Sequence, residues 1–179
     1  MITSEARTSI DPRLDATSRT VDPVHALMRY KVWADAELLN ALLTLPEPLS
    51  EPEGAIVTAI IRHFHTVDCI FKAHLLGVPH EYTSANPTEP AALSELQQRV
   101  SAIDEWYLAY TRNLDQRELG QVLHVQFTDG QQQLLSRSDI LLHVSLHGNY
   151  HRGNVGLLMK KCGVEPPQDR FTTYLRVRS

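Results

Sequence analysis

The chain has 179 residues, of which 42% are hydrophobic and 21% charged, and this mixture predicts one globular domain with a buried core. The formal net charge is −4 with acidic and basic residues interspersed, so the sequence offers no positive field or basic run of the kind that holds nucleic acid. There are two cysteines without CxxC spacing, and we recognise no signal peptide or membrane-length apolar run. We therefore expect a cytoplasmic protein that binds neither nucleic acid nor membrane.

The N-terminal end divides into an arm and a helix. Residues 1–22 are rich in Ser, Thr, Asp and Arg, and we expect a polar arm before a single domain over residues 23–179. Asp22 followed by Pro23 is typical of an N-cap and a first helical position. The helix that begins there is expected to end near Pro46, because proline cannot continue a helix.

Two further helices are expected in the middle of the chain. The first runs over about 53–76, and Gly77 is placed to end it. Residues 78–90 contain three prolines and several Ser and Thr residues, which predicts a loop. The next helix is expected over about 91–114.

A short β-hairpin is expected before the last long helix. Residues 121–136 show β character on both sides of Asp129-Gly130, a dipeptide that favours tight hairpin turns. The last helix is expected over about 139–161, capped by Ser138-Asp139 and closed by Gly163. The order of elements predicts an all-α fold, a four-helix bundle with this hairpin inserted.

The expected helix over 53–76 places one histidine in its apolar face. A helix advances about 100° per residue, and Ile60 and Val67 lie within about 60° of His63 by that count. His65, two residues later, is expected on the polar, solvated face. His74 shares the inward face but lies about 16 Å from His63 along the axis, too far to share an ion.

The last helix carries His143, His147 and His151 at intervals of four residues on one inward face. Residues four apart on a helix have Cβ atoms about 6 Å apart, so two imidazoles at this spacing can chelate one ion. We predict that His63, His147 and His151 bind one divalent transition metal. Three nitrogen ligands would leave open positions, as in catalytic zinc sites. On residue pattern alone, buried structural histidines remain the alternative.

Other residues near this pattern receive plainer interpretations. His143 could support a ligand, be a fourth ligand or fill space near the bundle end, and we favour the last. Cys69 lies four residues after His65, a spacing that we interpret as chance. Asp68 could accept a hydrogen bond from a ligand imidazole, but we prefer a solvated helical position.

Three segments of the sequence resemble the DinB/YfiT-like metalloenzyme family, the damage-inducible DinB-like proteins. They are Y-K-V-W-A at residues 30–34, the stretch over residues 62–75, and H-G-N-Y-H-R-G-N-V at residues 147–155. The third segment is the most specific, through its H-G-x-x-H-R-G-x-V pattern. The resemblance covers about residues 23–176.

The resemblance implies a four-helix bundle, often a homodimer, in which three histidines hold a divalent metal, commonly zinc or nickel. The family's first ligand falls on His63, five residues before Asp68, and its H-x-x-x-H pair falls on His147 and His151. The extra histidines at positions 65 and 143 depart from the family pattern. Some relatives transfer or isomerise small molecules with low-molecular-weight thiols, and many have no known activity.

Three candidate functions are consistent with a three-histidine metal site. The first is a metal-dependent transferase or isomerase that uses a low-molecular-weight thiol. The second is a metal-dependent hydrolase, disfavoured because no Glu adjoins a ligand as in H-E-x-x-H. The third is a non-catalytic, stress-linked metal-binding module. In the enzyme, Tyr30, Trp33 and Tyr150 could line the pocket and Arg152 could hold a carboxylate, but we prefer core packing for the three aromatics and a surface position for Arg152.

Overall fold

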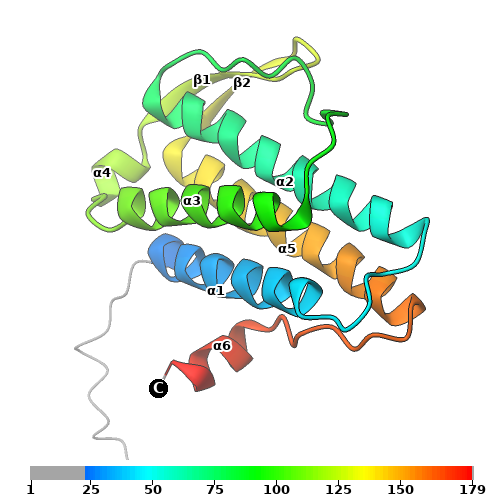
Figure 1. Ribbon diagram of the computed structural model, residues 1–179. Helices are drawn as coiled ribbons and strands as arrows, with labels where there is room; N and C mark the ends of the chain where they lie inside the picture. The colour runs from blue at the N-terminus through cyan, green and yellow to red at the C-terminus, as the bar shows by residue number, and fades with distance from the viewer. Residues whose placement is uncertain (1–22, 179) are drawn as a thin grey trace, which may run out of the picture.

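A computed structural model describes residues 23–178 and shows a bundle of four long helices (Figure 1). These are α1 (Pro23–Leu43), α2 (Glu53–Leu76), α3 (Leu93–Thr111) and α5 (Arg137–Lys161). Each of them packs against two others, because α1 and α2 both contact α3 on one side and α5 on the other. The expected fold class, a four-helix bundle with a hairpin before the last long helix, is confirmed.

The hairpin lies at the end of the bundle where α2 finishes (Figure 1). Its strands β1 (Val122–Gln126) and β2 (Gln132–Ser136) are antiparallel, with Val122 opposite Ser136 and Gln126 opposite Gln132. Gly130 in the turn has a φ of 85°, which glycine adopts without strain. The turn predicted at Asp129-Gly130 is therefore where the chain reverses.

Some helix ends differ from the predictions. The last long helix starts two residues early, because Ser136 rather than Ser138 is its N-cap, in a reciprocal capping box with Asp139. Two short helices, α4 (Gln116–Leu119) and α6 (Phe171–Val177), were not expected. The polar arm and the Asp22 cap fall outside the described residues.

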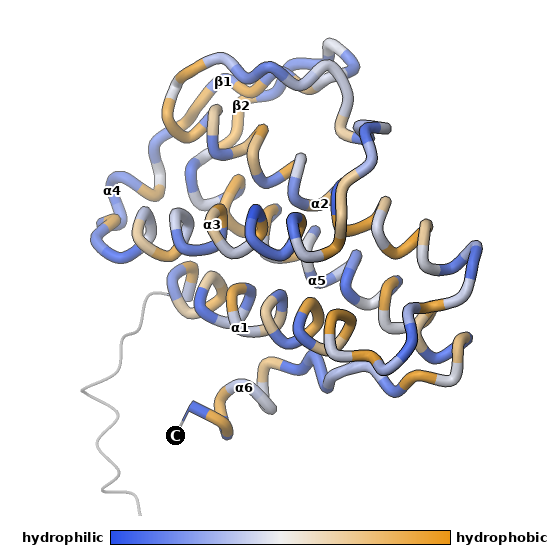
Figure 2. Tube along the Cα trace, in the orientation of Figure 1, coloured by the Kyte–Doolittle hydropathy of each residue, from blue (hydrophilic) through white to orange (hydrophobic). Residues whose placement is uncertain are grey.

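The bundle interior consists of two apolar clusters separated by a polar layer. The cluster near the hairpin includes Met28, Phe71 and Val144, and the other includes Leu38 and Val155. Apolar and polar residues accordingly alternate along every long helix (Figure 2). The polar layer between the clusters holds the functional residues described below.

By length and composition alone, helix α2 is long and apolar enough to cross a membrane, although no such segment was expected from the sequence. It lies in the bundle against α3 and α5, and its side chains Ile61, Phe64 and Asp68 are fully buried there. Its apolar character therefore follows from its place in the core.

Candidate metal centre

Three histidines predicted from the sequence meet where α2 and α5 pack together. His63 projects from α2, and His147 and His151 project from successive turns of α5. All three side chains are half-buried. Nε2 of His147 lies 3.2 Å from Nε2 of His63 and 3.1 Å from Nε2 of His151.

This spacing fits a single transition-metal ion. One ligand atom from each of the three histidines lies within 4.8 Å of the others. The two nitrogen separations of 3.1 and 3.2 Å are short enough for both pairs to bind one ion through metal–nitrogen bonds of about 2.05 Å. The three-histidine group could therefore hold a metal ion, and its occupancy by one stays a prediction.

Burial favours the neutral form of two of the three histidines. In the third, Nδ1 of His63 donates a hydrogen bond to the carbonyl oxygen of Ala85 at 2.9 Å, so Nε2 is the nitrogen that faces the other two histidines. Burial, with the neighbouring His151 and His63, lowers the pKa of His147 to about 3. Burial and His63 likewise lower the pKa of His151. Neutral imidazole is the ligand form.

A buried ionic network lies in the same layer, beside the ligand helices. Nζ of Lys31 is 2.8 Å from Asp35, 2.8 Å from Asp68 and 2.5 Å from Asp104. Arg152, the residue after the ligand His151, contacts Asp35 at 2.7 Å. All five side chains are buried. Lys31 thus ties α1 to α2 and α3, and Arg152 ties α5 to α1.

The network continues to the C-terminal segment. Nε of Arg152 lies 2.7 Å from Asp169, whose carboxylate also accepts a hydrogen bond from the Tyr30 hydroxyl. Tyr30 and Trp33 pack against Tyr174 of α6. The orientation of α5, and with it of two candidate ligands, is therefore fixed by ion pairs on the side that faces α1.

Several predictions about polar residues in this layer were wrong. Asp68 and Arg152, expected in solvent, are 0% and 3% exposed. His65 is also buried rather than solvated, and its Nε2 lies 3.6 Å from Sγ of Cys69. For His65 and Asp68 the reason is that α3 covers the face of α2 that the sequence assigned to solvent. Arg152 is buried where α5 packs against α1, beside its partners Asp35 and Asp169.

Two residues near the histidines also differ from expectation. Tyr150, expected to pack in the core, is 65% exposed. His143 is exposed at the side of α5, where its ring lies near Phe71 and His147. It is not part of the three-histidine group, and it does not fill the interior of the bundle end.

Sequence patterns did not predict the ion-pairing roles of Lys31, Asp35, Asp104 and Asp169. Lys31 and Asp35 are four residues apart on the first helix, and this spacing was the one local indication of a buried pair. The partners on other helices leave no comparable pattern, because they meet only after the bundle forms.

Gly148, which follows the candidate ligand His147 on α5, leaves the space that the buried ion pairs of Lys31 and Arg152 occupy. A Cβ at Gly148 would lie 3.1 Å from Nη1 of Arg152 and 3.5 Å from Cε of Lys31. We expect Gly148→Ala to lower the free energy of unfolding by about 1–2 kcal/mol, because the buried ion pairs must shift. Gly153→Ala, in the same helix with open space around its Cβ, is the matched control and should be neutral or mildly stabilising. Equal urea midpoints for both variants would contradict this account.

Comparison with known proteins agrees with this structure. The family model described as the DinB family matches residues 18–178. Protein DinB of Bacillus subtilis (strain 168) is 24% identical over 159 residues, covering 83% of this chain and 91% of that protein. The crystal structure of a DinB-like protein from Bacillus cereus ATCC 10987 has the same fold, with a TM-score of 0.59 and 15% identity over 82% of this chain and 95% of the other. The chain belongs to the DinB family.

Proposed function

We propose that this protein is a metal-dependent enzyme in which His63, His147 and His151 hold one divalent transition metal, zinc or nickel, per chain. The enzyme would use a low-molecular-weight thiol either to transfer a group between small molecules or to isomerise a small molecule. The observation that carries the proposal is the convergence of three imidazole nitrogens from two helices at metal-ligand spacing. Membership of the DinB family supports it.

The absence of a carboxylate base beside the histidines, among the described residues, favours thiol chemistry over hydrolysis. A divalent ion held by three neutral imidazoles would supply a Lewis acid that lowers the pKa of a bound thiol or water. Within residues 23–178, no carboxylate joins the three histidines to act as a general base for water. The three candidate ligands are half-buried between two helices, so their side chains are neither sealed in the core nor fully in solvent.

The metal content of protein purified without a histidine tag tests the first half of the proposal. We expect about one zinc or nickel per chain, and its loss in His63→Ala and in His147→Ala with helicity retained. His143→Ala is the matched control, one turn from His147 but outside the group, and it should keep the metal. No metal in the wild type, even after reloading with zinc and nickel, would refute the metal site.

A spectroscopic titration tests the second half. Glutathione or cysteine added to the cobalt-substituted protein should produce a thiolate-to-cobalt charge-transfer band, and His63→Ala should abolish it. If the metal is present but no thiol reaches it, and if its removal melts the fold, the non-catalytic module is the better interpretation. A cytoplasmic location also stays a prediction.

A further inference from the structure

Arg62 directly precedes the candidate ligand His63 on α2, and its guanidinium binds the main chain of the loop that follows this helix. Nε of Arg62 donates to the carbonyl oxygen of Pro87 at 2.7 Å, and Nη1 donates to the carbonyl oxygen of Glu89 at 3.1 Å. Within residues 23–178, no carboxylate forms an ion pair with this arginine. Its hydrogen bonds therefore fix the backbone of the loop and compensate no charge.

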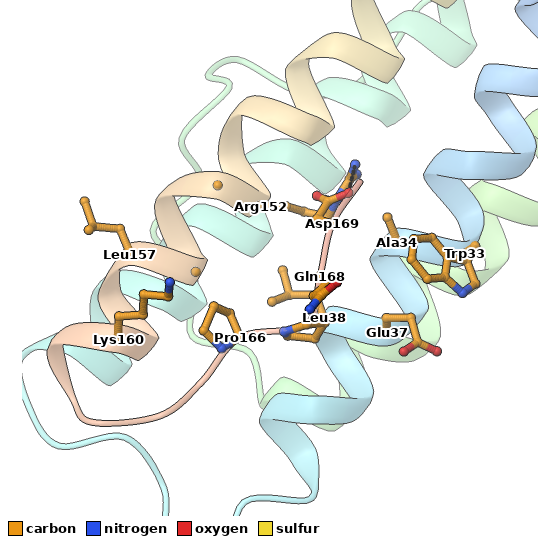
Figure 3. Close-up of a pocket in the computed structure, with 13 residues that line it drawn as sticks. Trp33, Ala34, Glu37, Leu38, Arg152, Leu157, Lys160, Pro166, Gln168 and Asp169 are labelled. Atoms are coloured by element: carbon orange, nitrogen blue, oxygen red, sulfur yellow. Dashed lines mark hydrogen bonds and ion pairs between the residues drawn. The ribbon is translucent and has the colours of Figure 1, made fainter. Parts of the chain in front are cut away.

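Arg152, which directly follows the candidate ligand His151, is bound in a different way. It donates to the carboxylates of Asp35 and Asp169, both at 2.7 Å, and Figure 3 shows it beside Asp169. These carboxylates compensate the charge of Arg152 where α5 packs against α1. Arg62, by contrast, ties α2 to a loop that contains neither helix nor strand.

The part of the loop that Arg62 holds has few other attachments. Residues 83–90 form hydrogen bonds to the rest of the described chain only through Arg62 and His63. Nδ1 of His63 donates to the carbonyl oxygen of Ala85 at 2.9 Å, and Ala85 also packs against the apolar cluster near the hairpin. The arginine and the candidate ligand, neighbours on α2, thus bind the same short segment.

This segment is stiff, so a hold at one end positions the other. Pro87 and Pro90 have fixed φ angles, and each restricts the residue before it to extended conformations. The two hydrogen bonds from Arg62 reach Pro87 and Glu89, whereas the bond from the histidine reaches Ala85, two residues before Pro87. Fixing the first two carbonyl groups therefore fixes the third.

We propose that Arg62 is a positioning residue of the metal site, because it holds the Ala85 carbonyl in place as the acceptor for Nδ1–H of His63. A ring nitrogen that donates to a fixed acceptor keeps its proton, which leaves the other nitrogen with the lone pair that a metal requires. In His63 that nitrogen is Nε2, 3.2 Å from Nε2 of His147. The step from ring position to metal affinity rests on the proposed function, whereas the hold on His63 does not.

The charge of Arg62 and its hold on the loop predict opposite effects on metal binding. A guanidinium near the site repels a divalent cation, so removal of its charge alone would strengthen metal binding. Loss of the hold would weaken metal binding, because the hydrogen-bond partners of ligand histidines typically contribute about 10–100-fold to metal affinity. The sign of the change therefore separates the two roles.

The tautomer of His63 in metal-free protein tests the hold directly. Long-range ¹⁵N–¹H correlation spectra of the imidazole rings at pH 8 should show His63 protonated at Nδ1 alone in the wild type, and a mixture of both tautomers in Arg62→Met. Arg62→Lys keeps a donor of similar reach and should restore most of the Nδ1–H form. Arg99→Met is the matched control, since Arg99 is an exposed arginine on α3 that pairs with Glu95, and it should leave His63 unchanged.

Zinc titration against a competing chelator tests the link to the metal. We expect Arg62→Met to bind zinc about tenfold more weakly than the wild type, Arg62→Lys to recover part of the loss, and Arg99→Met to match the wild type. Arg62 is only half-buried, so all three variants should keep their helicity.

Two results would overturn the proposal. One is a His63 ring that stays protonated at Nδ1 alone in Arg62→Met, and the other is zinc binding in that variant as tight as in the wild type or tighter. If the wild type itself binds neither zinc nor nickel, the metal site fails, and the tautomer of metal-free His63 still decides whether Arg62 positions this ring.

Discussion

Replacing Lys31 with methionine is expected to lower the free energy of unfolding by about 3–5 kcal/mol, because an uncharged side chain would leave the surrounding carboxylates without their shared cation. Nζ of Lys31 lies within 2.8 Å of Asp35, Asp68 and Asp104, and its side chain is 1% exposed. Although burial opposes it, these carboxylates raise the pKa of Lys31 well above its ordinary value, so the lysine is charged at all physiological pH values.

Urea unfolding followed by circular dichroism measures this effect, and Lys161→Met is its matched control. Lys161 also forms an ion pair, with Glu53 at 2.6 Å, but its side chain is 69% exposed. Exposed pairs contribute at most about 1 kcal/mol, so the control should shift the midpoint only slightly. Adding Asp68→Asn to Lys31→Met should recover part of the loss, because the two residues interact directly. If both lysine variants lost the same small amount, Lys31 would not be the centre of the layer.

The contribution of Asp68 to the free energy of unfolding is expected to decrease as pH rises from about 4 to 6, because Asp68 is the surplus carboxylate of the same network. Three buried aspartates face two buried cations, Lys31 and Arg152. Burial outweighs the Lys31 ammonium and raises the pKa of Asp68 to about 6. An unfolded aspartate has a pKa near 4, so the folded protein retains a proton that the unfolded chain has already released.

This difference in the pKa of Asp68 between the folded and unfolded states sets the direction in which the free energy of unfolding changes with pH. Each pH unit over which only the folded state is protonated lowers the free energy of unfolding by about 1.4 kcal/mol, so Asp68 contributes a loss of about 3 kcal/mol that persists above pH 6. Burial shifts the pKa of Asp104 in the same direction. Asp35 has the opposite effect, because Lys31 and Arg152 lower its pKa despite its burial.

Asp68→Asn isolates this contribution. The amide copies the shape of the protonated acid, so the variant should match the wild type near pH 4 and exceed its stability by about 1–3 kcal/mol at pH 8. Glu105→Gln, a neighbouring but exposed acid on α3, serves as the control and should show no such pH-dependent gain. A variant less stable than the wild type at pH 8 would show that Asp68 is ionised and needed as a partner of Lys31.

The predictions from sequence were most accurate where the information is local. Proline and glycine positions, capping residues and the Asp129-Gly130 turn depend on neighbours in the chain, so the bounds of the long helices and the hairpin were mostly predictable. The three-histidine group was predictable for the same reason. The interval of four residues on α5 puts His147 and His151 on one face, and His63 stands in the middle of an apolar stripe that must face inward.

The tertiary structure decided which polar residues outside the apolar stripe of each helix are buried. Periodicity assigns a helix one buried side, but α2 contacts both α3 and α5, so two of its sides are covered and His65 and Asp68 are buried. Lys31 also contacts Asp68 and Asp104, which lie 37 and 73 residues away in the chain. These two partners leave no pattern in the sequence, because they meet Lys31 only when the helices pack. The sequence alone therefore determined the elements and the candidate ligands, whereas helix packing determined which charges support them, because the burial of a charge depends on every neighbour that surrounds it.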